Sequence, residues 1–269
     1  MESSGEGGEG GSWLGFTEIE TKSEALARAE VFHIVKEVIG FVLFMHSQIP
    51  VILQDLENGF SSLKQELENL VSLAESKPSE IRKHNTRKME VKNAIKKHEK
   101  LMKGISNQLS ALQEALDSIS IIEEVRLVIG GSLVRPLYVY SMRFSVGKFG
   151  SSTSREGVVS KVAQTLSKKA IRALVSNGAG SSTHTGTSKL FLLIKCPSNF
   201  NMPLHFLPKR DFRYSKKAIQ WGLHIKCRVV ASQKGDNDSC HNFTDLDDVI
   251  WFHCRHAVKG VPCKKPEEC

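Results

Sequence analysis

The chain has 269 residues, of which 40% are hydrophobic and 25% are charged, and its formal net charge is +8. The length allows one large domain or two small ones, and the composition is that of a soluble globular protein. The positive charge raises nucleic acid or an acidic protein as a partner. Much of that charge falls within Arg82–Lys103, on the outer side of a predicted helix. A solvated basic helix face is therefore favoured, and nucleic acid is the less favoured partner.

The sequence indicates a reducing compartment. Residues 1–12 are acidic and rich in glycine, whereas a secretory signal is basic and then apolar. The most apolar segment, Ile34–Leu53, contains Lys36, Glu37 and Pro50, so it is a poor membrane span. The six cysteines are therefore expected to be mostly free thiols. We expect a protein of the cytosol or the nucleus with no membrane partner.

Composition divides the chain into three parts. Residues 1–20 begin with a stretch of Gly and Glu and are predicted to be a disordered N-terminus, in which Trp13, Leu14 and Phe16 are apolar groups able to dock on the domain. A single domain is predicted over residues 21–261. Residues 262–269 are predicted to be a flexible tail.

The domain begins with a strongly apolar helix. Ser23 is a candidate N-cap for a helix over 24–47. This helix is amphipathic in its first turns and apolar on nearly all sides from Val38 to Met45, so it is predicted to be buried on most sides.

A second, shorter helix is predicted next. Ser62 and Gln65 form a capping-box pair ahead of a leucine stripe, and the helix is expected to stop near Pro78. Residues 77–87 are predicted to be a polar, basic connector.

The longest periodic stretch is Val91–Ile119, whose apolar positions recur at steps of four and three. They are Val91, Ile95, His98, Met102, Ile105, Leu109, Leu112, Leu116 and Ile119. The stripe predicts a helix of about 30 residues, roughly 45 Å long. Such a helix is either half of a coiled coil or a brace under a β-sheet. The brace is favoured because the rest of the chain looks like a sheet that needs a cover.

After Ile122 the periodicity changes from helical to strand-like. Residues 125–129 and 137–146 are predicted to be the two strands of a hairpin that turns after Gly130-Gly131. Alternation in the second strand places Tyr138 and its apolar neighbours on one face.

The second half of the chain adds one helix and several strands. A helix is predicted over 158–176 and is followed by a linker, 178–188. Residues 197–210 are predicted to be irregular. Further strands are predicted at 190–194, 218–230 and 249–258. This order of elements predicts an α+β fold, with helices packed on an antiparallel β-sheet.

The last thirty residues are rich in Cys and His, but their spacing does not match a zinc site. His253 and Cys254 are adjacent in a predicted strand and should point to opposite faces. Gly130-Gly131 lacks the ending of a phosphate-binding loop, and no Ser-His-Asp set can be assembled. We therefore expect no catalytic residues, no metal and no cofactor.

A more informative segment runs from Phe206 to Arg213. Pro208 keeps the chain extended, and basic side chains with two aromatic residues project from a predicted surface loop. Such loops are typical contact devices, and an ordinary basic loop is the competing interpretation.

The order of elements and several short motifs resemble one family. The motifs are Val35–Leu56 with Gln48-Ile49-Pro50, Val125–Leu133 with Ile129-Gly130-Gly131, Lys168–Leu174, Phe206-x-Pro208-Lys209-x-x-Phe212-Arg213, and Ile250-Trp251-Phe252 followed by Lys259-Gly260. The chain resembles the comet-type adaptors, which bind the mitotic-arrest-deficient-two checkpoint protein. The motifs cover the chain between residues 30 and 260 in the correct order.

The resemblance implies a HORMA-like domain in which the long helix, 91–119, is central beneath the sheet. It also implies a non-enzymatic adaptor, monomeric alone, found in nucleus and cytoplasm and at chromosomes or kinetochores. Such adaptors bind the closed conformer of a HORMA-domain client and present it to a hexameric AAA+ ATPase of the pachytene-checkpoint type. The ATPase unfolds part of the client, which silences the spindle checkpoint and turns over HORMA proteins on meiotic chromosomes.

The resemblance assigns roles to individual residues. The client-binding residues are Met45, Lys168, Lys169, Ile171 and Arg172. The ATPase-engaging loop contains Pro208 and Lys209, and the safety-belt-like closing strand contains Ile250, Trp251 and Phe252. Met45 and Ile171 stand where the family usually has Gln and Phe, a departure that fits a distant lineage such as plants.

Two other functions stay open at this point. In a coiled-coil scaffold, the helix over 91–119 would pair with another chain. In a nucleic-acid-binding protein, Arg82–Lys103 would contact phosphates, and affinity would fall steeply with salt.

Overall fold

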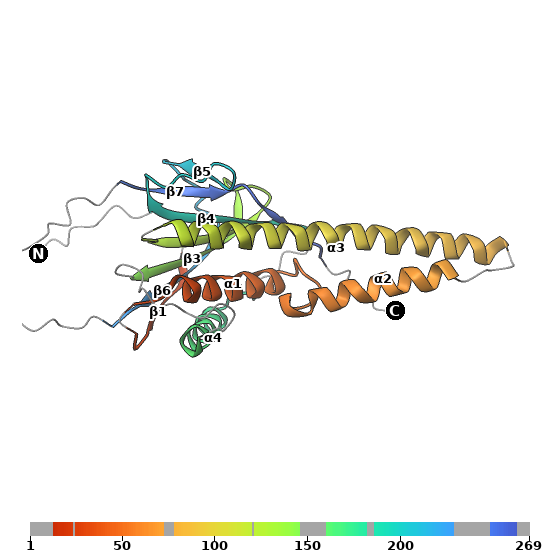
Figure 1. Cartoon of the computed structure of the whole chain (residues 1–269), viewed down its shortest axis with the longest axis horizontal. Coiled ribbons are helices and arrows are strands. Elements are labelled where there is room, and N and C mark those ends of the chain that lie inside the picture. Colours follow the sequence, from red (N-terminus) through yellow and green to blue (C-terminus); the bar gives the residue numbers. More distant parts are fainter. Residues whose placement is uncertain are drawn as a thin grey trace, which may run out of the picture.

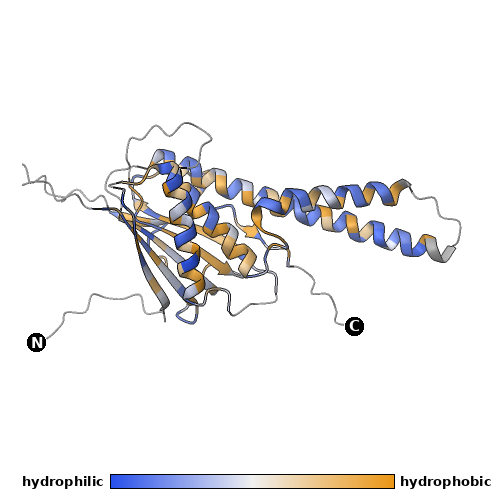
Figure 2. Ribbon diagram, turned by 90° about the horizontal axis from the view of Figure 1, so that it is seen from below, coloured by the Kyte–Doolittle hydropathy of each residue, from blue (hydrophilic) through white to orange (hydrophobic). Residues whose placement is uncertain are grey.

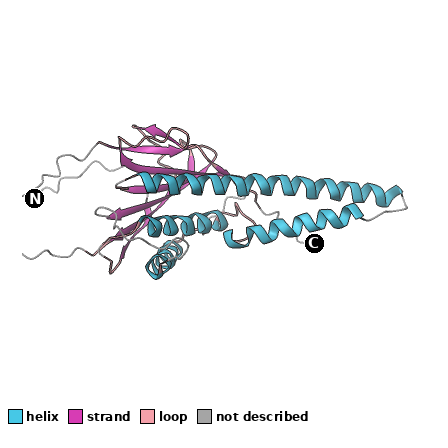
Figure 3. Ribbon diagram, viewed as in Figure 1, coloured by secondary structure: helices cyan, strands magenta, loops and turns pink. Residues whose placement is uncertain are grey.

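The computed structural model describes residues 13–23, 25–72, 78–119, 121–145, 160–181, 186–228 and 248–262. Within these ranges the chain forms four α-helices, a short 3₁₀ helix and eight strands. The helices are α1 (Arg28–Met45), α2 (Leu56–Ser72), α3 (Pro78–Ser118) and α4 (Lys161–Ser176), and the 3₁₀ helix is Leu53–Asp55. The strands are β1 (Trp13–Glu20), β2 (Glu124–Gly130), β3 (Pro136–Ser145), β4 (Lys189–Pro197), β5 (Phe206–Lys209), β6 (Ile219–Lys226), β7 (Val249–Cys254) and β8 (Val258–Lys259). Helices and one sheet form an α+β molecule (Figure 3).

The described strands form one mixed sheet in the order β1-β6-β3-β2-β4-β7-β5, and β8 also pairs with β4. The predicted hairpin is confirmed, since β2 and β3 pair in antiparallel register. The prediction of an antiparallel sheet is wrong at β6, which runs parallel to both of its neighbours, β1 and β3. Residues 210–218 lead from the end of β5, at one edge, back across the sheet to the start of β6. β6 therefore starts at the same end of the sheet as β5 and runs in the same direction.

Three helices cover one face of the sheet, with α1 lying between α3 and α4 (Figure 1). The predicted long helix is present, but α1 and not α3 has the middle position among the three helices. Because α1 is apolar on nearly all sides, it can be covered by the sheet and by a helix on either flank. α3 has a single apolar stripe, so it needs to be covered on one side only. It lies over β8, and the side chain of Gln108 donates from Nε2 to the backbone oxygen of His256 at 2.8 Å.

Beyond the sheet α3 continues as a projecting arm, which consists of Pro78–Lys103 and of α2 packed along it (Figure 1). The predicted stripe is confirmed, since Val91, Ile95 and Leu112 are at most 8% exposed. The stripe contacts α2 in the arm and covers the sheet in the body. The long helix therefore braces the sheet and also pairs with a helix, but the paired helix belongs to the same chain. Figure 2 shows that hydrophilic residues predominate along both helices of the arm, with hydrophobic residues between them.

Two helix boundaries in the arm differ from prediction. α2 begins at Leu56, and the Ser62 hydroxyl donates to the backbone oxygen of Asn58 inside the helix instead of capping it. Residues 78–87, predicted to be a connector, are the first turns of α3. They contain no glycine, and Pro78 takes the first helical position, where its missing N–H is not needed.

The ordered domain begins earlier than predicted. Residues 13–20 were assigned to the disordered N-terminus but form β1, in which Phe16 pairs with Gly222 of β6. Residues 1–12 lie outside the described ranges. The first helix begins at Arg28, not at 24, and its capping comes from the Glu30 carboxylate, which accepts from the Ala27 N–H at 3.0 Å.

Near the C-terminus, the predicted strand over 249–258 is two strands. β7 ends at Cys254 and β8 starts at Val258, with a bend between them. The predicted irregular segment, 197–210, contains the short edge strand β5.

The sheet face opposite the helices has a small core of its own, covered by the crossover 210–218. There Phe212, Tyr214 and Ala218 pack on inward-facing strand residues. These are Val128, Val139, Phe191, Leu193 and Trp251. Both sheet faces are therefore covered near the centre, which explains why the inner strands are apolar on both sides.

Candidate protein-interaction site

The predicted client-binding residues of α4 divide between its two sides. Ile171 is half-buried beside α1, and Lys168 and Arg172 are exposed on the outward surface next to it. Lys169 is exposed as well, but two residues correspond to about 200° around a helix. Lys169 therefore lies on the far side of α4 from Ile171. α4 carries four cationic residues and no acidic one, so this outer face is positive.

Ile171 contributes to an apolar hollow of about 230 Å³ between α4, α1 and the segment that follows α1. Its apolar lining consists of Phe41, Phe44, Ile52, Leu53 and Ile171. Phe44 is 42% exposed and Ile52 is 46% exposed, values that are high for residues of this size and hydrophobicity. We call this surface the Ile171 hollow. Lys36 and Glu37 lie at its polar rim.

The assignment of Met45 to this surface is not supported by its position. Met45 is partly buried, and its side chain lies against Gly180, where it occupies the space that a Cβ would need. The neighbouring Phe44 points into the Ile171 hollow instead. Sequence reasoning missed Phe44 because α1 is apolar all round at this end, so its periodicity does not show which side is exposed.

A second, larger hollow of about 660 Å³ lies where α1 meets α2 and α3. Lys36 and Leu53 line both hollows, so the two lie next to each other and share part of a wall. Phe32, Met102 and Leu109 supply its apolar wall. The helical face therefore carries two neighbouring hollows with apolar walls and charged residues in their linings.

Both ends of α4 are fixed by hydrogen bonds, which position Ile171. At the start, the Ser160 hydroxyl accepts from the Ala163 N–H at 3.0 Å and donates to the Glu30 carboxylate of α1 at 2.6 Å. At the end, the Asn177 side chain donates to Thr17 of β1 at 2.7 Å. The hollow thus lies between two helices whose relative position is set by specific contacts.

The predicted ATPase-engaging loop is an edge strand. Pro208 and Lys209 belong to β5, whose other edge is not paired within the described part of the chain. Both residues are exposed, and Leu207 beside them is 40% exposed. Proline is tolerated at a sheet edge because it lacks the N–H that an inner strand needs. The prediction that this segment is exposed is confirmed, the prediction of a loop is wrong, and the contact role stays a prediction.

The predicted closing strand, with Ile250, Trp251 and Phe252, is the inner strand β7 between β4 and β5. All three side chains are at most 7% exposed. Ile250 and Phe252 join the core under the helices, and Trp251 points to the opposite face.

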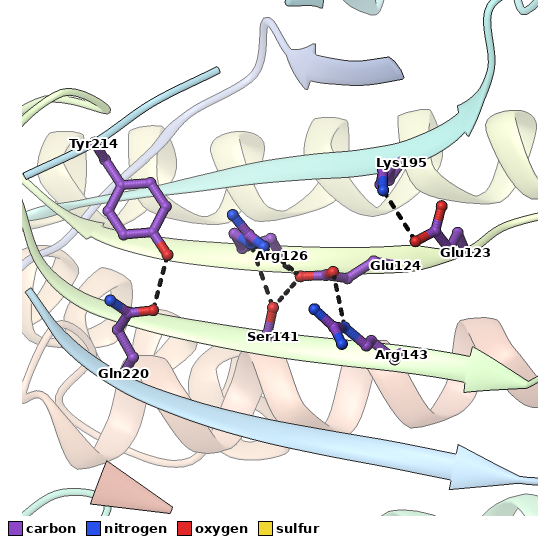
Figure 4. A network of polar contacts seen from close by, with 8 residues as sticks. All are labelled: Glu123, Glu124, Arg126, Ser141, Arg143, Lys195, Tyr214 and Gln220. Carbon is purple, nitrogen blue, oxygen red and sulfur yellow. Dashed lines mark hydrogen bonds and ion pairs between the residues drawn. The ribbon is translucent and has the colours of Figure 1, made fainter. Parts of the chain in front are cut away.

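A buried ion pair between Arg126 and Glu124 lies on that opposite face (Figure 4), and Trp251 packs against it. The Arg126 guanidinium lies 4.2 Å from the Trp251 ring centroid and donates to Glu124 through Nε at 2.9 Å and Nη2 at 2.8 Å. Glu124 also accepts from the Ser141 hydroxyl and from Arg143 at 3.2 Å. Removing one partner would leave an uncompensated buried charge, so this cluster favours the observed register of β2 and β3. We assign it a structural role.

The described thiols and histidines do not form a reactive site. Cys254 is buried in the core and His253 faces the other side of the sheet, as the alternation predicted. Cys196, Cys227 and Cys254 are unpaired, and burial raises the pKa of Cys196 to about 12 and that of Cys254 to about 11. Such thiols stay protonated and unreactive. The remaining three cysteines lie outside the described ranges.

The described residues hold no group of three His, Cys, Asp or Glu side chains arranged to bind a metal ion. None of their helices combines the length and hydrophobicity that a membrane span requires.

Comparison with known proteins assigns the chain to no family. No family model matches the chain, and no curated protein matches its sequence. The class that fold and site define is an α+β protein with two neighbouring apolar hollows on its helical face.

Proposed function

We propose that this protein is a non-enzymatic adaptor of the comet type, with a HORMA-like domain. It binds the closed conformer of a HORMA-domain checkpoint protein and delivers it to a hexameric AAA+ ATPase. The proposed outcome is silencing of the spindle checkpoint, remodelling of meiotic HORMA proteins, or both, in the nucleus and cytoplasm and at chromosomes. The ordered motifs between residues 30 and 260 motivate this proposal.

The observation that carries the proposal is the Ile171 hollow. Phe44 and Ile52 expose a large part of their apolar surface at a site where α1 and α4 are fixed relative to each other. An apolar centre with a charged rim is the usual layout of an interaction hot spot. The exposed Lys168 and Arg172 beside it favour a client with an acidic border.

The proposed ATPase contact lies at the sheet edge opposite β1. Pro208 and Lys209 are exposed on the edge strand β5, whereas α4 contacts β1 and β6 near the other edge. Client and ATPase would therefore occupy separate surfaces. β7, with Trp251, would act as the closing strand that holds β5 in place.

The test is co-elution of the purified full-length protein with a closed-state HORMA client, run beside the open-state form of the same client. Wild type is expected to bind the closed form only. Ile171→Asp places a charge in the Ile171 hollow and is expected to weaken binding at least 30-fold, since a hot-spot residue contributes about 2 kcal/mol or more. Val134→Asp is the matched control, because Val134 is 65% exposed in the β2–β3 turn and should bind as wild type does.

Lys209→Ala separates the two proposed surfaces in the same experiment. It should retain client binding and lose ATPase-driven remodelling of the client. Undiminished binding by a folded Ile171→Asp variant would exclude the hollow as the client site, and binding of neither client form would exclude the adaptor function.

A further inference from the structure

The basic side of α3 in the projecting arm faces solvent and has no role in the proposed client contact. Lys92, Lys96, Lys100 and Lys103 are spaced four, four and three residues apart, so they form one row along the helix. All four are exposed. The apolar stripe that contacts α2 contains Val91 and Ile95, and the row lies on the other sides of the helix.

The four lysines are not neutralised within the described part of the chain. None of the ion pairs found there includes them, whereas Arg87 of the same helix pairs with Glu66 of α2 at 2.6 Å. Glu99 is the one acidic residue in the sequence between Lys92 and Lys103, and it lies beside the row. The row therefore keeps a concentrated positive charge on a straight, rigid support.

We propose that this row, the arm lysines Lys92, Lys96, Lys100 and Lys103, binds the phosphate backbone of double-stranded nucleic acid without sequence preference. At 1.5 Å per residue the row is about 16 Å long. One strand of a duplex carries a phosphate about every 3.4 Å of helix axis, so the row spans about five phosphates. Contacts of this kind supply affinity and orientation but do not read bases.

The side chains around the row favour a duplex over the other polyanions. Single-strand binding relies on aromatic side chains that stack on bases, and no Phe, Tyr or Trp occurs between Lys92 and Lys103. An acidic protein would need apolar anchors at the centre of the contact. The exposed residues of this stretch are all polar, namely the lysines, Asn93 and Glu99. The arm also projects away from the sheet, where a long straight ligand can approach (Figure 1).

The test is fluorescence anisotropy of a labelled 20-base-pair DNA duplex with the full-length protein, between 50 and 200 mM salt. We expect a dissociation constant on the order of micromolar at 50 mM salt, which is in the stronger part of the non-specific range. Four phosphate contacts predict a slope of log K against log salt of about −3.6, or roughly a 150-fold loss of affinity over this range. A duplex RNA of equal length shows whether both sources of phosphate are accepted.

Three variants make the test specific. Changing all four arm lysines to Gln should weaken binding more than tenfold and flatten the salt slope by about one unit per lysine. The control changes Lys189, Lys216, Lys217 and Lys259 to Gln; it removes the same charge from exposed positions elsewhere and should bind as wild type does. Glu99→Gln removes the one negative charge beside the row and should tighten binding two- to fivefold. This gain does not depend on the folding of the fourfold variant.

Several outcomes would overturn the proposal. They are absence of duplex binding at 50 mM salt, equal loss in the fourfold variant and its control, and no gain for Glu99→Gln. Binding of labelled polyglutamate as tightly as the duplex would assign the row to an acidic protein instead.

Discussion

His46, at the C-terminal end of α1, is a titratable group in the middle of the core. It is 1% exposed, stacks on Tyr138 with ring centroids 4.0 Å apart, and shares a 2.6 Å hydrogen bond between its Nε2 and the Tyr140 hydroxyl. Burial lowers the pKa of His46 from 6.5 to about 4 and raises the pKa of Tyr140 well above its usual value. Both groups are therefore neutral at physiological pH, as a buried pair must be.

The lowered pKa of His46 predicts a loss of stability in acid. Below pH 6.5 the unfolded chain takes up a proton on His46 that the folded chain does not take up until about pH 4. The free energy of unfolding should therefore fall as the pH drops through this window, by up to about 3 kcal/mol from this group. His46→Phe keeps the stacking on Tyr138 but removes the titration. Urea unfolding at pH 7 and pH 5 should show a loss for wild type that is larger than the loss for the variant by about 2 kcal/mol.

Burial also lowers the pKa of His98, His224, His253 and His256. These residues change the free energy of unfolding equally in wild type and in His46→Phe, so their effects cancel in this comparison. Equal acid loss in wild type and His46→Phe would contradict the assignment of the effect to His46.

At the scale of elements, the joint between α1 and α4 is the contact that shapes the Ile171 hollow. The Glu30 carboxylate accepts from the Ala27 N–H of its own helix and from the Ser160 hydroxyl at the start of α4. Two helix N-termini thus share one carboxylate, a favourable arrangement because both ends are electropositive.

This joint predicts a coupled effect on stability. Ser160→Ala removes an N-cap and should lower the free energy of unfolding by about 1 kcal/mol, and Glu30→Ala should have a similar effect. The double variant should cost less than the sum by 0.5 kcal/mol or more, because both changes break the same contact. Denaturant unfolding measures all three. Thr165→Ala, on the exposed side of α4, is the control and should stay within about 0.5 kcal/mol of wild type. Strict additivity would contradict the shared contact.

The elements predicted correctly are those whose signal is local. The stripe from Val91 to Ile119, the hairpin at Gly130 and the helix before Asn177 depend on periodicity and turn residues within a short window. What the sequence did not show depends on distant partners. β1 is a strand because it pairs with β6, and β6 is parallel because the crossover 210–218 returns over the sheet.

The candidate site follows the same rule. The family resemblance assigns Ile171 to the client-binding surface, and the structure places this residue in the wall of a hollow. Phe44 and Ile52 were not predicted, since an all-round apolar helix and the segment after it carry no signal of which side stays exposed. Met45 was predicted one position away from Phe44, and one position on a helix is a turn of about 100°.

For the molecule as a whole, the structure accounts for the apolar stripe of α3 without a second chain. α2 covers it in the arm, and the body covers it over the sheet. We therefore expect a monomer, with a mass near 29.9 kDa by light scattering after size-exclusion chromatography. The mass should not change between micromolar and hundredfold higher protein concentration. A concentration-dependent shift to twice this mass would favour the coiled-coil scaffold.

The pairing of β1 has a consequence for folding during synthesis on the ribosome. Trp13 of β1 pairs with Gln220, and β1 has no other strand as a neighbour among the described residues. β1 leaves the ribosome long before β6 and must therefore wait until β6 has been synthesised before it can pair. The α2–α3 arm, by contrast, needs only its own residues and can form early, because local contacts close quickly and distant ones slowly. During this interval a chaperone has access to the unpaired β1 beside an arm that is already folded.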